Sequence, residues 1–243
     1  MRDGLGGIDT VAVIGGTSDI GLAIARELTS LGARRYVLAG RDLDSMKAGA
    51  GELPVDDLVA LDLASDSPTR AVESIFAGGD VDVVVLTAGV LHNDPNPAQI
   101  EEMAVVNGSG SVAAMAAVAR ALNAQGHGHL VVLSSIAAVR PRPSNYWYGA
   151  SKAALDFAAR GLSDEMLGSG IRVTVVRPGF VRSKMTDGMD SAPFTVQPEE
   201  VAKAVTAAVR DATEGVVWVP GVLRWVSLVL QWLPLSLLKR IDT

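Results

Sequence analysis

The chain has 243 residues, with 27 acidic and 21 basic side chains and a formal net charge of −6 at pH 7. Hydrophobic residues make up 49% of it and charged residues 20%, which excludes a disordered chain. The acidic balance argues against a nucleic-acid-binding protein, which would carry a basic patch. Because cysteine is absent, disulfides, thiolate zinc sites and cysteine nucleophiles are excluded.

Short apolar runs rich in β-branched residues alternate with longer helical stretches. The predicted strands are Thr10–Ile14, Tyr36–Ala39, Leu58–Leu61, Val81–Leu86, Leu130–Ser134, Arg172–Val176 and Val216–Val219. The predicted helices are Ile20–Leu31, Ser67–Phe76, Ile100–Ala124, Tyr148–Leu167 and Pro198–Arg210. Continuous apolar runs are typical of strands buried on both faces of a parallel sheet. The alternation therefore predicts an α/β fold, a single Rossmann-type doubly wound parallel sheet of about seven strands with helices on both faces, in one domain over residues 1–243.

A glycine-rich turn joins the first predicted strand to the first predicted helix. Gly15 permits the tight turn after the strand, and Gly21 permits close packing of the helix on the sheet. The helix N-terminus then offers free N–H groups and a positive dipole end to a pyrophosphate. The predicted dinucleotide-binding residues of this turn are Gly15, Thr17, Ser18, Asp19, Ile20 and Gly21. The alternative is an ordinary turn in which Ser18 or Asp19 caps the helix.

The residues after the second predicted strand bear on the choice between NADH and NADPH. An acidic residue there binds the ribose 2′-hydroxyl of NAD, whereas an arginine accommodates the 2′-phosphate of NADP. Gly40 stands where the acid is usual and Arg41 follows it, which favours NADPH. Asp42 leaves the other cofactor open, because its carboxylate can neutralise Arg41 or bind a ribose itself.

Tyr148 and Lys152 lie four residues apart at the start of a predicted helix, so they share one helix face. A cation about 4 Å from the phenol, at an effective dielectric of about 20, is worth about 4 kcal/mol. That would lower the pKa of Tyr148 by about three units from its ordinary value of about 10. The phenol would then serve as a general acid/base near neutral pH. The alternative is a pair on the helix surface without a function.

Other polar residues accompany this pair. Ser135 ends the fifth predicted strand, where a hydroxyl faces the ligand crevice of an open α/β sheet, and Asn107 lies in the long helix before it. With the glycine turn, Tyr148 and Lys152, these residues make the chain resemble the short-chain dehydrogenase/reductase family from residue 10 to about residue 220.

The resemblance implies a role for each of these residues. Tyr148 is implied as the catalytic acid/base, and Lys152 as the residue that lowers its pKa and holds the nicotinamide ribose. Ser135 is implied to orient the substrate carbonyl, and Asn107 to hold a water of the proton relay. The further cofactor contacts that the resemblance implies are Asp62, Leu63, Ala88, Gly89, Pro178, Gly179 and Val181.

Three residues depart from the family's pattern. Ile14 replaces a threonine before the glycine turn, Asp19 replaces the middle glycine, and Thr87 replaces the asparagine of an Asn-Ala-Gly motif. Asp19 has the largest consequence, because a carboxylate beside a pyrophosphate is unfavourable unless it points away or caps the helix. It bears on cofactor affinity and preference, and leaves the predicted fold unchanged.

The sequence is also similar to a narrower family, the decaprenylphosphoryl-2-keto-ribose reductases. The similar segments are residues 15–23, 78–83, 124–126, 148–156, 176–179 and 217–220. This similarity implies reduction of a lipid-linked keto sugar to decaprenylphosphoryl-arabinose for cell-wall arabinan synthesis. It also implies a flavin-dependent oxidase partner that completes the epimerisation, and NADH in place of the NADPH that Arg41 favours. The alternatives are a reductase of another ketone or 3-oxoacyl substrate, and a non-catalytic cofactor-binding interaction protein.

Residues 222–243 form a predicted apolar C-terminal extension with a helical tail. Arg224, Gln231 and Pro234 interrupt it, so it is no clean membrane span. Trp225, Trp232, Lys239 and Arg240 would suit a helix lying in a membrane interface, and the alternative is a subunit contact. We expect a homo-oligomer, in the cytoplasm or peripherally at the cytoplasmic membrane face, without a signal peptide. His127 and His129 lack a third ligand, so no metal site is predicted.

Overall fold

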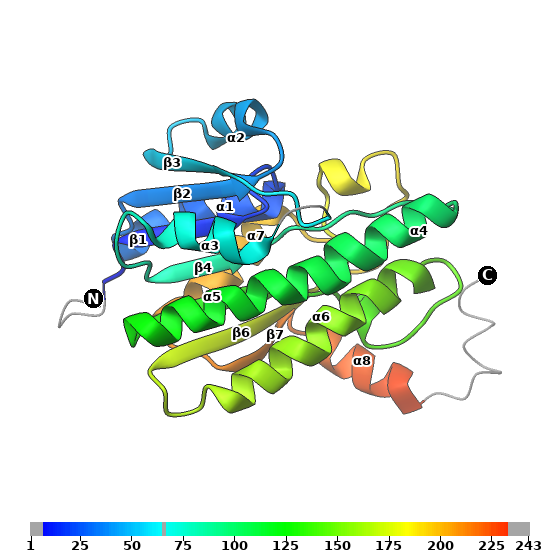
Figure 1. Ribbon diagram of the computed structural model, residues 1–243. Coiled ribbons are helices and arrows are strands. Elements are labelled where there is room, and N and C mark those ends of the chain that lie inside the picture. Colours follow the sequence, from blue (N-terminus) through cyan, green and yellow to red (C-terminus); the bar gives the residue numbers. More distant parts are fainter. Residues whose placement is uncertain (1–6, 65–66, 233–243) are drawn as a thin grey trace.

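The computed structural model describes residues 7–64 and 67–232 (Figure 1). Its strands are β1 (Thr10–Ile14), β2 (Arg35–Gly40), β3 (Val55–Ala60), β4 (Val83–Leu86), β5 (Gly128–Leu133), β6 (Ile171–Pro178) and β7 (Gly215–Val219). Its α-helices are α1 (Asp19–Leu28), α2 (Leu43–Ala50), α3 (Pro68–Phe76), α4 (Pro97–Met103), α5 (Ser111–Gln125), α6 (Tyr146–Glu165), α7 (Pro198–Arg210) and α8 (Leu223–Trp232). Shorter helical segments are η1 (Thr29–Leu31), η2 (Ala104–Gly110), η3 (Ile136–Ala138) and η4 (Lys184–Thr186).

The seven strands form one parallel sheet in the order β3-β2-β1-β4-β5-β6-β7. The predicted Rossmann-type sheet is therefore confirmed. The strand order reverses between β1 and β4, and open sheets of this kind bind ligands at such a point, outside the carboxyl ends of the strands. The glycine turn after β1 opens directly onto this crevice.

Helices cover both faces of the sheet (Figure 1). One core packs under α1 and α7, and the other packs under α3, α5 and α6. In β1, Val11 and Val13 belong to the first core, whereas Ala12 and Ile14 belong to the second. Every residue of β1 is therefore buried, and burial on both faces is why such strands appear in the sequence as continuous apolar runs.

The helices α4, η2 and α5 form one continuous rod, Pro97–Gln125, which is longer than the predicted Ile100–Ala124. Its middle segment, η2, is a π-helix, a rare form that occurs often at functional sites. The rod is long and apolar enough to cross a membrane, but 61% of its apolar window is buried inside the protein. Its apolar character is that of a core helix, because it packs on the sheet.

Two differences from the predicted elements have simple causes. No predicted helix covers α2, because it has only two buried residues, Met46 and Ala50, and therefore no long apolar pattern. The strand β3 begins at Val55 and not at the predicted Leu58. It is an edge strand of the sheet with exposed carboxylates near its start, and charged residues are common on edges because they discourage pairing with other chains.

The helix α8 follows β7 and forms the first part of the predicted apolar extension. Leu223 and Ser227 on one side of α8 are buried against the rest of the fold. The remainder of the predicted tail, residues 233–243 with Lys239 and Arg240, lies outside the described residues.

Candidate functional site

The turn after β1 is tied to the end of β4. Gly15 has a φ of +96°, a left-handed conformation that favours glycine, and a Cβ on it would lie 2.6 Å from the backbone nitrogen of Ala88. The hydroxyl of Thr87 donates to the carbonyl oxygens of Ile14 and Gly15 at 3.2 and 3.3 Å. Thr87, which departs from the family's asparagine, therefore has a structural role, because its hydroxyl joins the end of β4 to the turn after β1.

The N-terminus of α1 points into the crevice from this turn. Ser18 caps the helix, and its hydroxyl accepts the N–H of Gly21 at 3.2 Å. Asp19 turns toward η4, where its carboxylate accepts the backbone N–H of Lys184 at 2.7 Å and pairs with the Lys184 ammonium at 3.2 Å. The Asp19 carboxylate would be unfavourable beside a pyrophosphate, but the backbone N–H and the ammonium of Lys184 offset its charge.

Ser135, Tyr148 and Lys152 converge from β5 and α6. A hydrogen bond joins the side chains of Ser135 and Tyr148. The Lys152 ammonium is buried and donates to the carbonyl oxygen of Leu133 at 3.1 Å. A Cβ on Gly89 would lie 3.0 Å from Oδ1 of Asn107 and 3.1 Å from Nζ of Lys152, so both side chains lie directly beside Gly89. The structure therefore gathers the four residues that were predicted as catalytic.

The expected lowering of the Tyr148 pKa by Lys152 is wrong for this structure. Burial raises the pKa of Tyr148 to about 12, and the hydrogen bond from Ser135 only partly opposes that rise. Burial also lowers the pKa of Lys152 to about 8. The ammonium bonds the backbone at Leu133, and desolvation outweighs any charge effect on the phenol. Tyr148 is consequently a protonated phenol at neutral pH, ready to donate a proton.

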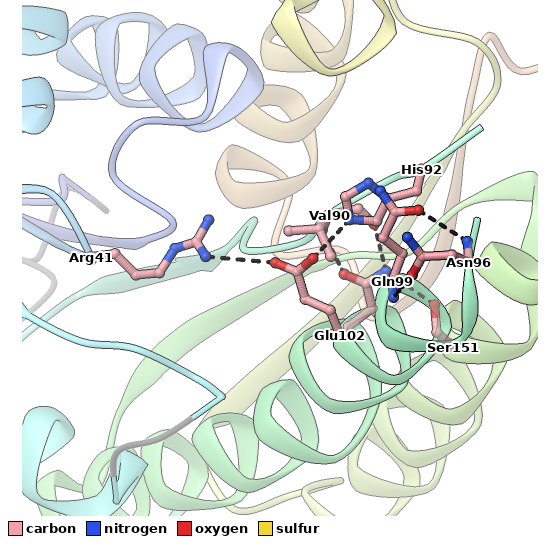
Figure 2. Close-up of polar contacts among 8 residues, drawn as sticks. Arg41, Val90, His92, Asn96, Gln99, Glu102 and Ser151 are labelled. Carbon is pink, nitrogen blue, oxygen red and sulfur yellow. Dashed lines mark hydrogen bonds and ion pairs between the residues drawn. The ribbon is translucent and has the colours of Figure 1, made fainter. Parts of the chain in front are cut away.

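Asn107 lies in the π-helical segment η2 and is 0% exposed. Its side-chain amide accepts the N–H of Val90 at 2.7 Å and donates to the carbonyl of Val90 at 2.8 Å and to the hydroxyl of Ser151 at 3.0 Å. Val90 and Ser151 are labelled in Figure 2. The side chain thus fastens the segment after β4 to α6, one residue before Lys152.

A buried ion pair that no sequence pattern predicted lies next to the chain segments of the predicted catalytic residues. The Asp156 carboxylate accepts two hydrogen bonds from Arg177, at 2.8 and 2.6 Å, and one from the Ser134 hydroxyl at 2.6 Å. Arg160 adds a further contact at 3.1 Å. Asp156 follows Lys152 by one helical turn, Ser134 precedes Ser135, and the Pro178–Gly179 pair follows Arg177. The network therefore holds three chain segments that carry predicted site residues.

The predicted cofactor contacts further from Tyr148 also lie around the crevice. Asp62 follows β3 and accepts the N–H of Ala64 at 2.9 Å. Gly179 follows β6 and donates its N–H to Val219 at 2.9 Å, and Val181 bridges to Val196. Thr17, Ile20 and Leu63 stay predicted cofactor contacts.

Arg41 does not pair with Asp42. The Asp42 carboxylate caps α2, where it accepts the backbone N–H of Ser45 at 2.9 Å and the Ser45 hydroxyl at 2.6 Å. These hydrogen bonds hold the pKa of Asp42 below its ordinary value. Arg41 instead lies 3.7 Å from the carboxylate of Glu102 on α4. No sequence pattern indicates Glu102, because no local spacing links it to Arg41.

Comparison with known families decides what this arrangement is. Residues 9–193 match the family model of the short chain dehydrogenases. This chain belongs to the short-chain dehydrogenase/reductase family.

Its relatives include curated proteins and solved structures. An uncharacterised oxidoreductase of Streptomyces coelicolor is 41% identical, and the match covers 99% of this chain and 98% of the relative. An uncharacterised oxidoreductase of Mycobacterium tuberculosis is 37% identical, over 96% of this chain and 97% of the relative. An actinorhodin polyketide ketoreductase solved with NADPH shares the fold, with a TM-score of 0.76, 24% identity, and coverage of 89% of this chain and 97% of that one.

The short-chain dehydrogenase/reductase is an NAD(P)H-dependent oxidoreductase, and its crevice fits such a dinucleotide. The left-handed turn at Gly15 brings the N-terminus of α1 to the switch point of the sheet. Lys184 draws the Asp19 carboxylate away, which leaves that helix end suited to an anion. Lys152 adds a buried cation beside Gly89.

Proposed function

We propose that this enzyme reduces the 2-keto group of decaprenylphosphoryl-2-keto-ribose, giving decaprenylphosphoryl-arabinose for cell-wall arabinan synthesis. The exposed apolar face of α8 carries the proposal. Trp225, Val229 and Trp232 are 65%, 64% and 85% exposed, and their spacing places them on one face of the helix. An exposed apolar face of this kind marks a contact with protein or membrane, and a polyprenyl-linked substrate resides in a membrane.

The position of α8 links this face to the site. A Cβ on Gly179 would lie 2.8 Å from Cδ1 of Leu223, the first residue of α8, and 3.7 Å from the backbone oxygen of Phe194. Phe194 and Met185 are exposed apolar side chains of the same region of the chain. An apolar surface therefore adjoins the loop expected to border the nicotinamide, which supports a substrate with a long apolar group.

Charge supports the same location. Residues 222–240 contain Arg224, Lys239 and Arg240 and no acidic residue, although the chain as a whole has a net charge of −6. Basic residues near an apolar face are attracted to the anionic lipids of the cytoplasmic leaflet. The proposal therefore places the enzyme peripherally at the cytoplasmic face, where soluble NAD(P)H is available.

The chemistry uses the residues gathered around the crevice. Reduction adds a hydride to the carbonyl carbon and a proton to its oxygen, and a reduced nicotinamide supplies the hydride when bound. Ser135 would orient the carbonyl by a hydrogen bond, and Tyr148 would donate its phenolic proton to the oxygen. Lys152 and Asn107 would return a proton to the phenol through water.

The cofactor would lie along the carboxyl ends of the strands. Its pyrophosphate would meet the turn from Gly15 to Gly21, and its adenosine end would meet Arg41, Asp62 and Leu63. The nicotinamide would lie near Ala88, Gly89, Pro178, Gly179 and Val181. Both NADH and NADPH remain candidates under this proposal.

Two partners complete the proposal. A flavin-dependent oxidase would supply the ketone by removing a hydride from C2 of decaprenylphosphoryl-ribose and a proton from its 2-hydroxyl, with the flavin as acceptor of the hydride. A second copy of this chain would pack on α6, where Phe157 is exposed, as is Leu167 just beyond the end of the helix. Such apolar side chains on the outer surface favour a homo-oligomer.

The decisive test is a coupled assay with lipid-linked and soluble substrates. Purified enzyme and a flavin oxidase would receive decaprenylphosphoryl-ribose, with NADH and NADPH in parallel, and the arabinose product would be scored. The same enzyme would also reduce a water-soluble ketone. The double variant Trp225→Gln/Val229→Gln should lose at least about ten-fold in turnover of the lipid-linked substrate, since it removes two exposed anchors worth about 1.5 kcal/mol or more together.

The soluble ketone is the control, because its turnover should not depend on α8. Product with one cofactor would support the substrate class and identify the preferred nucleotide. No arabinose product with either cofactor, from enzyme that still reduces the soluble ketone, would leave the family chemistry standing and reject this substrate. If the α8 double variant lost the same factor in turnover on both substrates, the cause would be damage to the fold and not loss of a membrane contact.

The pH dependence of reduction should reveal Lys152. Its pKa of about 8 means that the ammonium loses its charge as the pH rises through that value. The kcat/KM for ketone reduction should therefore fall above about pH 8, because kcat/KM reports groups of the free enzyme. Lys152→Arg keeps a cation, since arginine stays charged, so the decline should vanish in that variant. A decline at the same pH in both proteins would assign it to another group.

A further inference from the structure

Glu102 stands between two basic side chains at the rim of the crevice (Figure 2). One oxygen of its carboxylate lies 3.7 Å from a guanidinium nitrogen of Arg41, and the other lies 2.8 Å from Nε2 of His92. The Glu102 side chain is 35% exposed and that of His92 is 27% exposed. Glu102 is therefore held in place by His92 on one side while it faces Arg41 on the other.

These three residues come from different sides of the switch point. Arg41 directly follows β2, whereas His92 lies beyond β4 and Glu102 belongs to α4. Because β1 separates β2 from β4 in the sheet, the contact between Arg41 and Glu102 spans the crevice from one side to the other. A nucleotide whose ribose lies at the end of β2 would meet both side chains.

The charge available at Arg41 depends on Glu102 and not on Asp42. Asp42 is engaged at the start of α2 by two hydrogen bonds from Ser45. Glu102, in contrast, has a carboxylate oxygen directed at the guanidinium. A ribose 2′-phosphate would have to displace that carboxylate from Arg41 and would be repelled by it.

We propose that Glu102 determines nucleotide specificity by weakening the binding of NADPH relative to NADH. The inference rests on the placement of the cofactor's adenosine end beside Arg41 in the proposed function. NADH has a 2′-hydroxyl, which tolerates a neighbouring carboxylate and can donate a hydrogen bond to it. NADPH has a 2′-phosphate, which needs the guanidinium that Glu102 occupies.

The test is a set of titrations with NADH and NADPH in the absence of any ketone, followed by the quenching of tryptophan fluorescence. The quantity compared is the ratio of the Kd for NADH to the Kd for NADPH. Glu102→Gln should raise this ratio about five-fold, the size expected for a partly exposed ion pair of about 1 kcal/mol. Glu101→Gln is the matched control, since it removes the same charge from the neighbouring, exposed position of α4.

A second background shows whether Glu102 acts through Arg41. Arg41→Gln should weaken NADPH more than NADH, and adding Glu102→Gln to it should then change the ratio by much less than in the wild type. The inference is overturned if Glu102→Gln leaves the ratio within about two-fold, which is the range of independent effects. It is also overturned if Glu101→Gln produces the same shift.

Titrations with adenosine 2′,5′-bisphosphate and 5′-AMP separate this inference from the proposed function. The two ligands differ only in the 2′-phosphate and contain no nicotinamide, so they report the adenosine end alone. If they bind and Glu102→Gln favours the bisphosphate, the inference holds whatever ketone the enzyme reduces. If folded wild type and every variant bind none of the four nucleotides, the proposed function and this inference both fail.

Discussion

Tyr148→Phe should lower the rate of ketone reduction by about 10²–10⁴-fold while leaving nucleotide binding unchanged. The substitution keeps the aromatic ring of the helix α6 and removes only the hydroxyl that hydrogen-bonds Ser135. That hydroxyl is protonated at neutral pH because burial raises its pKa to about 12. Positioned proton transfer contributes about 10²–10⁴-fold to a rate, so a loss of that size in kcat is expected.

Tyr146→Phe is the matched control for this experiment. Tyr146 lies two residues earlier on α6, is 44% exposed and packs against the ring of Trp147. The same chemical change there should leave the rate within about two-fold of the wild type, as surface substitutions usually do. Full cellular function of Tyr148→Phe would instead favour a non-catalytic, nucleotide-binding protein. The measurements are single-turnover reduction rates and nucleotide Kd values on the same preparations.

Asp156→Asn should lower the free energy of unfolding by about 3 kcal/mol. It leaves the largely buried Arg177 guanidinium without its carboxylate, and removing one partner of a buried pair typically costs about 3–5 kcal/mol. For a chain of this size the Tm should fall by about 6–12 °C. Urea unfolding of Asp156→Asn and Asp164→Asn would check this, because Asp164 is an exposed carboxylate on the same helix. Equal stability of the two variants would contradict the role of the network.

The same carboxylate predicts how stability depends on pH. Burial alone would raise the pKa of Asp156, but hydrogen bonds from Arg177 and Ser134 and the charges of Arg177 and Arg160 outweigh it and hold the pKa below its ordinary value. A lowered carboxyl pKa means that the stabilisation is fully present above the unfolded pKa, about 3.9. It is lost as the pH falls below that value, and Asp156→Asn should flatten this part of the stability curve.

The sequence predicted the strands well because each core strand is buried on both faces. Val11 and Val13 face one core while Ala12 and Ile14 face the other, so burial leaves a continuous apolar run. The edge strand β3 and the short helix α2 bury too little to produce such a pattern. Their boundaries were therefore wrong or missing.

In the candidate site, too, residues that are close in the sequence were predicted, and pairs that only the fold brings together were not. Tyr148 and Lys152 were found because a helix brings residues four apart onto one face. Asp156 with Arg177, and Arg41 with Glu102, join residues that are far apart in the chain, so no spacing reveals them. The predicted shift of the Tyr148 pKa had the wrong direction. Desolvation depends on how the structure packs, and the spacing of Tyr148 and Lys152 carries no information about it.

The contact between Asp19 and Lys184 bears on the order in which ligands enter and leave. It joins the turn at the start of α1 to η4, which lies in the segment between β6 and α7. Because Lys184 already engages the Asp19 carboxylate, this contact can persist with a nucleotide at the helix N-terminus, and the segment held by Asp19 would then restrain that nucleotide. Binding of nucleotide and binding of ketone would thereby be linked through one carboxylate. Steady-state kinetics should consequently follow a compulsory sequence, with the nucleotide first to arrive and last to depart.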